Sequence, residues 1–349
     1  MFPYYLCIAP SLVGVLCFRK LNKLIIYTLW TIGAVSLFLL VPEGSRDIAT
    51  YVSSFDEVQS MPLHDLLFKD PLFYLTTYIF AKVHFPAQWF FILLACLALL
   101  IKFKAISRLT NKSIYAVLLY MSSYFYLHEF TQIRIALALG TWMFALSYLE
   151  ISPKRYLLLS LLASSIHLAA ILSFFSYIIL RIFKTPNRRI IFLAIAIVIV
   201  ILGLGHFLEN IGDSLIRSIP DPRTDLYFSM REHSNWDRPN SLSITNIWAI
   251  GTAMIVLLPS VGRFFKFRPT PLDYALTQSI LVGSMALSIL ASMPIAAYRV
   301  SEFFLCLLPV QFARILDVQT RPVKVATSLI FSLVLGYAYV FKFQILIPS

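Results

Sequence analysis

The sequence predicts an all-α, polytopic integral membrane protein, and three observations lead to this fold class. Of 349 residues, 59% are hydrophobic and only 13% are charged, whereas soluble domains carry about 25% charged residues. Mean hydropathy is +0.80, and the apolar residues fall in blocks of about 17–22, the length that a helix needs to cross about 30 Å of hydrocarbon. The 29 Phe and 18 Tyr residues suit lipid-facing helices with aromatic side chains at the interfaces.

The first apolar segment, Phe2–Phe18, is interpreted as a retained helix. No basic segment precedes it and it lacks a small-residue cleavage site, so it does not have the pattern of a signal peptide. The basic residues that follow it place the N-terminus outside. We expect about 10–12 spans in a single membrane domain over residues 1–349, some of them broken or re-entrant. The further predicted spans are Leu24–Val41, Gln88–Ile101, Ser113–Leu127, Ile133–Leu149, Tyr156–Leu180, Ile190–Phe207, Leu242–Pro259, Leu272–Met293, Val300–Leu316 and Val323–Phe341.

Charged residues separate strongly between the connecting segments. Cytoplasmic loops of membrane proteins are enriched in Lys and Arg, so the basic loops are predicted to be cytoplasmic. These loops are Arg19–Lys23, Lys102–Lys112, Lys154–Arg155, Arg181–Arg189, Arg263–Arg268 and Arg314–Lys324. Most acidic residues fall in the other segments, and the long segments 42–70 and 208–241 are predicted to be external loops.

Two segments do not fit a simple alternation of spans. A full crossing by Pro71–Phe85 would place Lys102–Lys112 outside, so we expect a re-entrant or interfacial helix there. Tyr156–Leu180 lies between two basic loops and is too long for one span and too short for two. A bent helix or broken hairpin around His167 would resolve this, because irregular backbone is tolerated at membrane depth when protein surrounds it.

The composition also limits the chemistry. The net charge of +12 is explained by cytoplasmic loops, so no nucleic-acid partner is expected. The four cysteines lie inside apolar segments without metal-ligand spacing. The sequence contains no Gly-rich phosphate loop, CxxC pair or nucleophile elbow. We therefore predict no metal and no cofactor, and an ATP-driven pump is not expected.

A polar cluster at 128–134 interrupts the apolar pattern. It contains His128, Glu129 and Gln132, and it ends with Arg134 at the start of an otherwise apolar helix. A charge at membrane depth is costly and normally faces a protein interior or a cavity. Arg134 is therefore a candidate functional residue, against the alternative that it snorkels to the surface or pairs locally with Glu129.

His167 is the only ionisable residue between Arg155 and Arg181. Histidine can accept a proton near neutral pH, which makes His167 a candidate proton acceptor or phosphate partner. The alternative is a buried neutral histidine that bonds to a backbone carbonyl or to Ser164.

Arginine predominates among the basic residues predicted to be external. Its planar guanidinium suits bidentate capture of phosphate or carboxylate, so these arginines are candidate substrate ligands. Those in the second external loop include Arg217, Arg223 and Arg231. Two further candidate groups lie near span ends, namely Arg46 and Asp47 with Tyr51, and Arg299 with Glu302. An ordinary solvated loop is the alternative for the first group, and a plain i,i+3 salt bridge for the second.

The order of these motifs resembles the EpsG family of Wzy-like polymerases. Gln132-Ile133-Arg134 begins an Ala/Leu-rich helix, a basic turn at 154–155 follows, and the next helix carries Ile166-His167. Arg46 and Asp47 with Tyr51 look like the family's Arg/Asp/Tyr segment, and Arg299 looks like its late arginine. The similarity is best over about residues 46–180.

This resemblance implies a polymerase of O-antigen or capsule repeat units, with an architecture like that of GT-C membrane glycosyltransferases, in the bacterial inner membrane. Its partners would be the lipid bilayer and polyprenyl-diphosphate-linked oligosaccharides on the periplasmic side, with a chain-length regulator protein as a further candidate. The growing glycan would move from its lipid diphosphate onto a hydroxyl of a lipid-linked repeat unit. Arg134 and Arg299 would hold the diphosphate, and His167, Glu129 or Asp47 would take the hydroxyl proton, with His167 favoured.

Two other classes of function remain open from the sequence. Ionisable residues inside a membrane also mark transport pathways, so a flippase or carrier of lipid-linked oligosaccharide is the main alternative. Transporters often contain internal repeats, and none is visible between the two halves of this sequence. A scaffold within a polysaccharide assembly complex is a third possibility, although it would give the external arginines no role.

Overall fold

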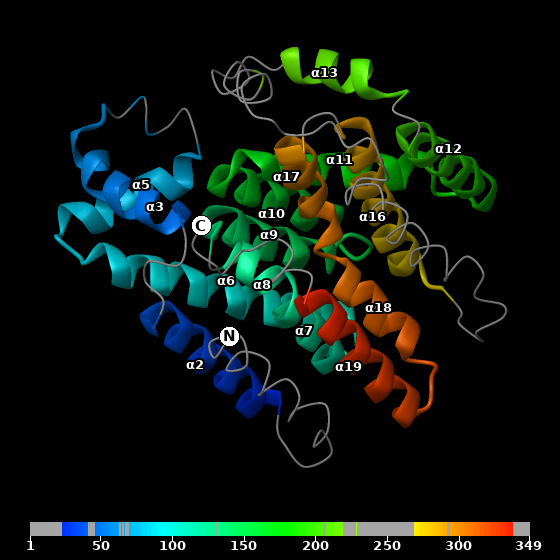
Figure 1. The fold of residues 1–349 in the computed structure, drawn as a ribbon, viewed down its shortest axis with the longest axis horizontal. Helices are drawn as coiled ribbons and strands as arrows, with labels where there is room; N and C mark the ends of the chain where they lie inside the picture. Colours follow the sequence, from blue (N-terminus) through cyan, green and yellow to red (C-terminus); the bar gives the residue numbers. More distant parts are fainter. Residues whose placement is uncertain are drawn as a thin grey trace. The chain divides into compact units, whose positions relative to one another are not determined.

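The structure is a computed structural model, and the residues that it describes form helices, turns and irregular segments without a strand (Figure 1). The described residues are 23–40, 46–62, 64, 66, 70–129, 131–204, 207–218, 228, 269–291 and 294–337. The chain divides into two compact units, Met1–Phe174 with Phe312–Ser349, and Phe175–Gln311. The predicted spans Phe2–Phe18 and Leu242–Pro259 lie outside the described residues.

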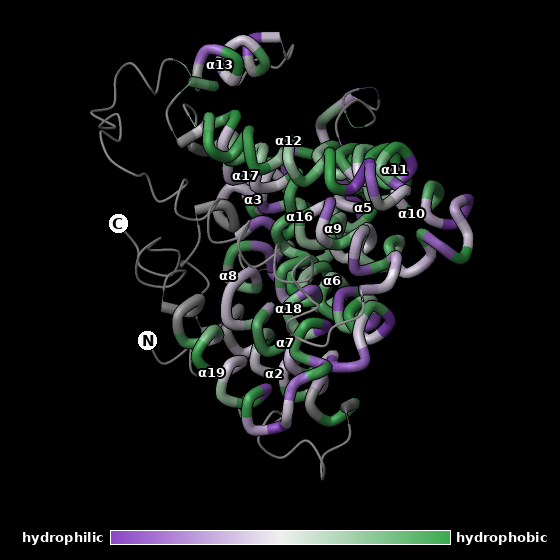
Figure 2. The backbone as a smooth tube through the Cα atoms, turned by 90° about the vertical axis from the view of Figure 1, so that its right-hand side faces the viewer, coloured by the Kyte–Doolittle hydropathy of each residue, from purple (hydrophilic) through white to green (hydrophobic). Residues whose placement is uncertain are grey.

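Among the described residues, two helices are long and apolar enough to cross a membrane, α6 (Ala87–Leu109) and α16 (Pro271–Ile289). Shorter apolar helices accompany them, at Ser113–Ser122, Ile133–Leu146 and Leu168–Ile182. The all-helical prediction is confirmed for the described residues. The sequence of helix α12 (Pro186–Leu204) is apolar from Ile190 onward, and Figure 2 colours most of this helix as hydrophobic.

The first unit is built around α6. Its other helices are α2 (Lys23–Leu40), α3 (Arg46–Glu57), η1 (Val58–Ser60), α5 (Pro71–Lys82), α7 (Ser113–Ser122), α8 (Tyr124–His128), α9 (Ile133–Leu146), α10 (Pro153–Ile166), η2 (Leu168–Ile171) and α19 (Arg321–Tyr337). Figure 1 shows α6 between α2 and α9, and both pairs are in contact. A Cβ on Gly140 of α9 would lie only 3.2 Å from the Ala98 carbonyl oxygen of α6, so glycine permits this close approach.

Helices α6 and α9 run in the same direction, which defines two ends of this unit. Near the starts of these helices, Phe91 of α6 and Arg134 of α9 both contact Tyr51, with a ring-centroid distance of 5.6 Å and a Cζ–centroid distance of 5.3 Å. At their last turns, Arg108 of α6 donates a hydrogen bond to the Tyr148 hydroxyl just after α9, at 2.6 Å. We call the first the Arg134 end and the second the Arg108 end.

Helix α5 occupies most of the segment 71–85, for which a re-entrant or interfacial helix is expected. Its 12 residues span about 18 Å, which is less than the hydrocarbon thickness. Its preceding residue, Asp70, contacts Arg134, while Phe80 near its other end packs on Phe90 of α6 with ring centroids 5.0 Å apart. Both ends of α5 therefore lie at the Arg134 end. The segment before it, predicted as a loop, contains helix α3.

Three predicted basic loops meet at the Arg108 end. Arg108 and Arg155 both lie against Tyr148, and Lys112 forms an ion pair with Asp317 at 3.1 Å. One assignment was wrong, because Lys102 is not in a loop. It lies inside α6, and its side chain is fully buried. Burial is possible because the Glu129 carboxylate neutralises its charge.

The predicted break at His167 is confirmed. Helix α10 ends at Ile166, His167 is extended (φ −152°, ψ 126°), and the chain resumes as η2 and then α11 (Leu172–Ile182). Elsewhere, the predicted span Ser113–Leu127 bends at Ser123, between α7 and α8.

The second unit contains α12, α13 (Glu209–Arg217), α16 and α17 (Pro294–Leu305). Helix α16 begins with a capping box, in which the Thr270 hydroxyl accepts from the Asp273 N–H and the Asp273 carboxylate accepts from the Thr270 N–H. The predicted continuous span Val300–Leu316 was wrong, because α17 ends at Leu305 and α18 covers Leu308–Leu316. Pro309 lies in the first turn of α18 and is a sequence signal for this break, because proline fits the start of a helix and not its interior.

Candidate functional site

The carboxylate of Asp70 joins the two residues that the sequence analysis ranked first. Its Oδ2 accepts a hydrogen bond from Arg134 Nη1 at 3.0 Å and lies 2.9 Å from His167 Nδ1. The three side chains come from the start of α5, the first turn of α9 and the break after α10. Residues far apart in the sequence therefore form one cluster at the Arg134 end, and we call it the Asp70 cluster.

Asp70 also stabilises the break that carries His167. Its Oδ1 accepts a hydrogen bond from the Leu168 N–H at 2.7 Å. This N–H lies at the start of η2, where backbone donors have no partner within the helix. Asp70 precedes Pro71 and has the position of an N-cap for α5, but its side chain makes no capping bond there. Its backbone is left-handed (φ 40°), a conformation that costs energy in a non-glycine residue and often marks functional sites.

Aromatic rings surround the Arg134 guanidinium. Its Cζ lies 5.3 Å from the Tyr51 ring centroid, 5.5 Å from that of Phe73 and 5.9 Å from that of Tyr74, and Nη1 also donates to the Tyr74 hydroxyl at 3.3 Å. Asp70 is 6% exposed, whereas the side chains of Arg134 and His167 are 24% and 20% exposed. The carboxylate is thus shielded while its two partners remain accessible.

The electrostatics of the cluster favour an ionised Asp70. Burial raises the pKa of this carboxyl, but the hydrogen bond and charge of His167, the Leu168 N–H and the charge of Arg134 outweigh it and hold the pKa below 3.8. An ionised carboxylate can only accept hydrogen bonds, so we assign the proton of the His167 ring to Nδ1. His167 Nε2 then carries the lone pair that can accept a proton.

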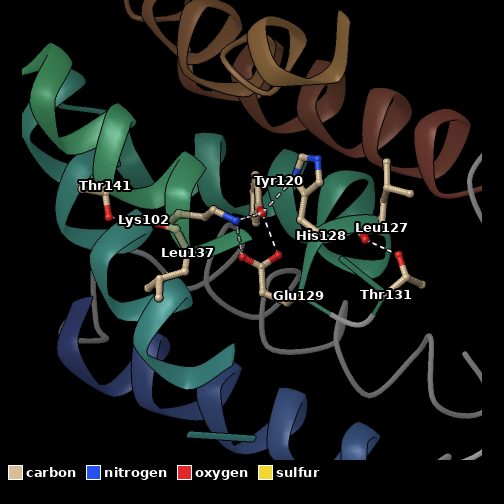
Figure 3. A network of polar contacts seen from close by, with 8 residues as sticks. All are labelled: Lys102, Tyr120, Leu127, His128, Glu129, Thr131, Leu137 and Thr141. Carbon is tan, nitrogen blue, oxygen red and sulfur yellow. Dashed lines mark hydrogen bonds and ion pairs between the residues drawn. The ribbon is translucent and has the colours of Figure 1, made fainter. Parts of the chain in front are cut away.

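A second polar network lies deeper in the same unit. Lys102 of α6 pairs with Glu129 Oε1 and donates to the Tyr120 hydroxyl at 2.6 Å, and that hydroxyl donates to Glu129 Oε2 at 2.7 Å. Figure 3 shows these three side chains pointing toward one another, with the His128 ring beside Tyr120. Lys102, His128 and Glu129 are completely buried. We call these four residues the Lys102 network.

The Lys102 network changes the interpretation of the 128–134 motif. Glu129 pairs with Lys102, and Arg134 pairs with Asp70, so the local Glu129–Arg134 pair that the sequence left open as an alternative does not form. The buried position of Glu129 favours a positioning role over proton transfer to a substrate. His128 Nε2 and Gln132 Oε1 are buried and have no hydrogen-bond partner among the described residues.

Comparison with known proteins assigns the chain to a family. A sequence model of the EpsG family matches residues 24–347, which is nearly the whole chain. The chain is a member of the EpsG family. No curated protein and no solved structure matches it. EpsG membership and the apolar helices together indicate a membrane protein with a role in polysaccharide polymerisation.

The structure places the other candidate residues of this EpsG chain in several locations. Tyr51 belongs to the Asp70 cluster through its contact with Arg134. Arg299 and Glu302 lie on α17 in the second unit, and Arg217, at the end of α13, stacks on Phe228 at 3.9 Å. Arg46 and Asp47 lie in the first turn of α3, but their side chains are outside the described part, as are the residues Arg223 and Arg231.

Sequence reasoning missed Asp70 as a functional residue. It treated this residue as the end of an external segment, although an Asp before Pro and an apolar helix is a typical N-cap pattern. That pattern would have predicted only local capping. The contact with His167 joins residues 97 positions apart, and no local sequence signal encodes it.

Proposed function

We propose that this EpsG-family protein is a glycosyltransferase that polymerises lipid-linked oligosaccharide repeat units in the bacterial inner membrane. The observation that supports the proposal most is the Asp70 cluster, which combines a candidate base with a candidate anion ligand. Its substrates would be two polyprenyl-diphosphate-linked oligosaccharides at the periplasmic face. The architecture would be that of a polytopic, GT-C-like membrane enzyme.

The cluster suits each part of the reaction. A hydroxyl oxygen of the acceptor sugar attacks the anomeric carbon of the donor glycan, and the bond from that carbon to the polyprenyl diphosphate breaks. His167 Nε2 takes the hydroxyl proton, while the carboxylate of Asp70 orients the ring and stabilises the positive charge that it acquires. Arg134 stabilises the negative charge that develops on the departing diphosphate. Arg299 remains a predicted second ligand of this diphosphate.

The charge distribution supports a periplasmic location for the reaction. Basic segments collect at the Arg108 end, which is therefore the cytoplasmic end. Arg134 and Tyr148 are 14 positions apart along and just beyond α9, so the Asp70 cluster lies about 20 Å from the Arg108 end. Lipid-linked repeat units displayed on the outer surface would meet the cluster there.

Deletion of the gene followed by gel analysis of surface polysaccharide tests the activity. We expect the ladder of polymer to collapse to one repeat unit on its lipid core, with recovery upon expression of the wild-type protein. Loss of even the single unit would contradict the polymerase proposal and favour a flippase. Loss of a chain-length regulator would change the length of the polymer. The absence of polymer of any length would therefore show that the deleted protein is not such a regulator.

The role of His167 is tested separately. His167→Gln retains hydrogen bonding but cannot take the proton, so polymer formation should fall about 10²–10⁴-fold, as with His167→Ala. Gel densitometry at matched expression measures the effect. The control is Ser165→Ala, a partly exposed position one residue from the end of α10, which should leave polymer formation unchanged. Near-normal polymer from His167→Gln would show that this histidine is not the base.

A further inference from the structure

A cluster of cations and aromatic rings lies at the Arg108 end, apart from the residues of the proposed reaction. Arg108 donates to the Tyr148 hydroxyl, and its Cζ lies 4.7 Å from the Tyr148 ring centroid and 5.0 Å from that of Phe144. Arg155 approaches the same Tyr148 ring, with its Cζ 5.7 Å from the centroid. One tyrosine therefore holds two guanidinium groups from different helices close together.

The basic residues of this cluster outnumber the acidic ones beside them, because Glu150 is the one acidic residue in the turn that carries Tyr148. Lys104 lies one turn before Arg108 on α6, and Lys154 is adjacent to Arg155 on α10; all four side chains are exposed. None of these four cations forms an ion pair within the described part of the chain. Cations that are held side by side without a carboxylate repel one another, so an anion bound between them would relieve this repulsion.

Exposed apolar side chains border the cluster. Ile151, in the turn between α9 and α10, is 80% exposed, and Leu158, one turn after Arg155 on α10, is 66% exposed. Such side chains face lipid in a membrane protein. Basic and aromatic residues beside a lipid-facing surface occupy the depth of the phospholipid headgroups. An anion that carries acyl chains would contact both parts of this surface.

We propose that Arg108, Arg155 and Tyr148 form a binding site for the phosphate of an anionic phospholipid, with Lys104 and Lys154 adding attraction. The acyl chains would lie along Leu158 and the exposed face of α10. The arginines suit the phosphate because each presents several donors in a planar array. The proposal depends on a membrane location and does not depend on the polymerase reaction.

Native mass spectrometry of the full-length protein in detergent tests the site with phosphatidylglycerol, and with phosphatidylcholine of the same acyl chains. We expect tighter binding of phosphatidylglycerol, and about 25-fold weaker binding in the double variant Arg108→Gln/Arg155→Gln, because each basic residue near an anionic lipid contributes about a fivefold factor. Elution of the variant as a single species in size-exclusion chromatography shows that it is folded.

The matched control is Lys184→Gln/Arg188→Gln. It removes the same charge from exposed positions in another predicted cytoplasmic loop, and it should change phosphatidylglycerol binding by less than about twofold. Equal losses in both double variants would mean that general positive charge attracts the lipid, which would overturn the proposed site. Equal binding of the two lipids by the wild type would overturn it as well.

Variants of Tyr148 test whether this ring holds the two arginines in one preformed site or whether each arginine attracts the lipid independently. Tyr148→Phe keeps the ring but removes the hydroxyl that accepts from Arg108, so lipid binding should weaken less than in Tyr148→Ala. An unchanged affinity in Tyr148→Ala would contradict the role of the ring. Inorganic phosphate at millimolar concentration should not displace the lipid, and displacement would identify free phosphate as the occupant instead.

Discussion

Arg134 illustrates how a single charge near the start of an apolar helix can be interpreted. The sequence indicated that such a residue faces protein or a cavity, because its exposure to lipid would be costly. In the structure its guanidinium contacts Asp70 and three aromatic rings while a quarter of the side chain remains exposed. This environment orients the group without hiding it, as its proposed role as a diphosphate ligand requires.

The first prediction concerns the geometry of this charge. Arg134→Ala should lower polymer formation about 100-fold or more, because one donor to developing negative charge typically contributes that much. Arg134→Lys should recover little, since an ammonium cannot reproduce bidentate contacts. Polymer ladders at matched membrane expression measure both. Arg188→Lys, at an exposed position, serves as the control. Full activity of Arg134→Lys would mean that charge alone suffices.

The second prediction follows from the lowered pKa of Asp70. Because folding lowers this pKa below 3.8, the carboxylate stabilises the fold above that value, and the contribution disappears as the pH falls through the lowered pKa. Wild type should therefore have a higher thermal midpoint than Asp70→Asn at about pH 6, and the difference should shrink below about pH 4.

Thermal unfolding in detergent across this pH range measures the effect. Asp56→Asn is the control, because Asp56 is exposed on α3 and has no described hydrogen bond. A difference between wild type and Asp70→Asn that does not vary with pH would contradict the assignment of the effect to ionisation of this carboxyl.

At the scale of elements, the Lys102 network fixes the segment before α9 against α6. Lys102 belongs to α6, and Glu129 lies four residues before the first residue of α9. The close approach at Gly140 fastens the same two helices further along. Together these contacts determine where the first turn of α9 lies, and with it the position of Arg134. Glu129 is thus a candidate positioning residue.

The third prediction tests this pair with thermal unfolding in detergent. Lys102→Met or Glu129→Leu should each destabilise the protein by about 3–5 kcal/mol, because each leaves a buried group without its partner. Lys102→Met/Glu129→Leu should be less destabilised than the worse single variant. The partly exposed pair Lys112–Asp317 is a matched control, for which Lys112→Met should cost less than about 1 kcal/mol. If the losses of unfolding free energy in the two single variants add up in the double variant, Lys102 and Glu129 do not stabilise each other.

At the scale of the whole molecule, the distribution of basic segments determines the expected orientation. In the first unit these segments meet at one end, and the Asp70 cluster lies at the other. Helix α5 has both ends at the Arg134 end, so it does not reverse the direction of the chain. The charge pattern and the helix directions therefore agree on one topology.

The fourth prediction tests this topology with cysteine labelling in intact cells. In a background with the four native cysteines replaced, an impermeant maleimide should label Gln59→Cys in η1 and should not label Glu150→Cys between α9 and α10. Both positions are exposed. Labelling of Glu150→Cys only after permeabilisation would confirm its accessibility. External labelling of Glu150→Cys would reverse the orientation and place the Asp70 cluster on the cytoplasmic side.

The sequence by itself determined the helical class and most helix positions in the described part, and it selected Arg134 and His167 as candidate functional residues. These depend on hydropathy over about 20 residues and on isolated charges in apolar surroundings, which are local properties. It also anticipated the break at His167, because the two flanking basic loops require the chain to return to the same side.

Only the tertiary structure decided which charges pair. Asp70 meets His167, and Lys102 meets Glu129 rather than facing water. Each contact joins separate helices, and a sequence pattern gives the periodicity of one helix without its rotation or depth against another. Partners of buried charges are fixed by helix packing, since desolvation leaves a charge stable only where an opposite one reaches it.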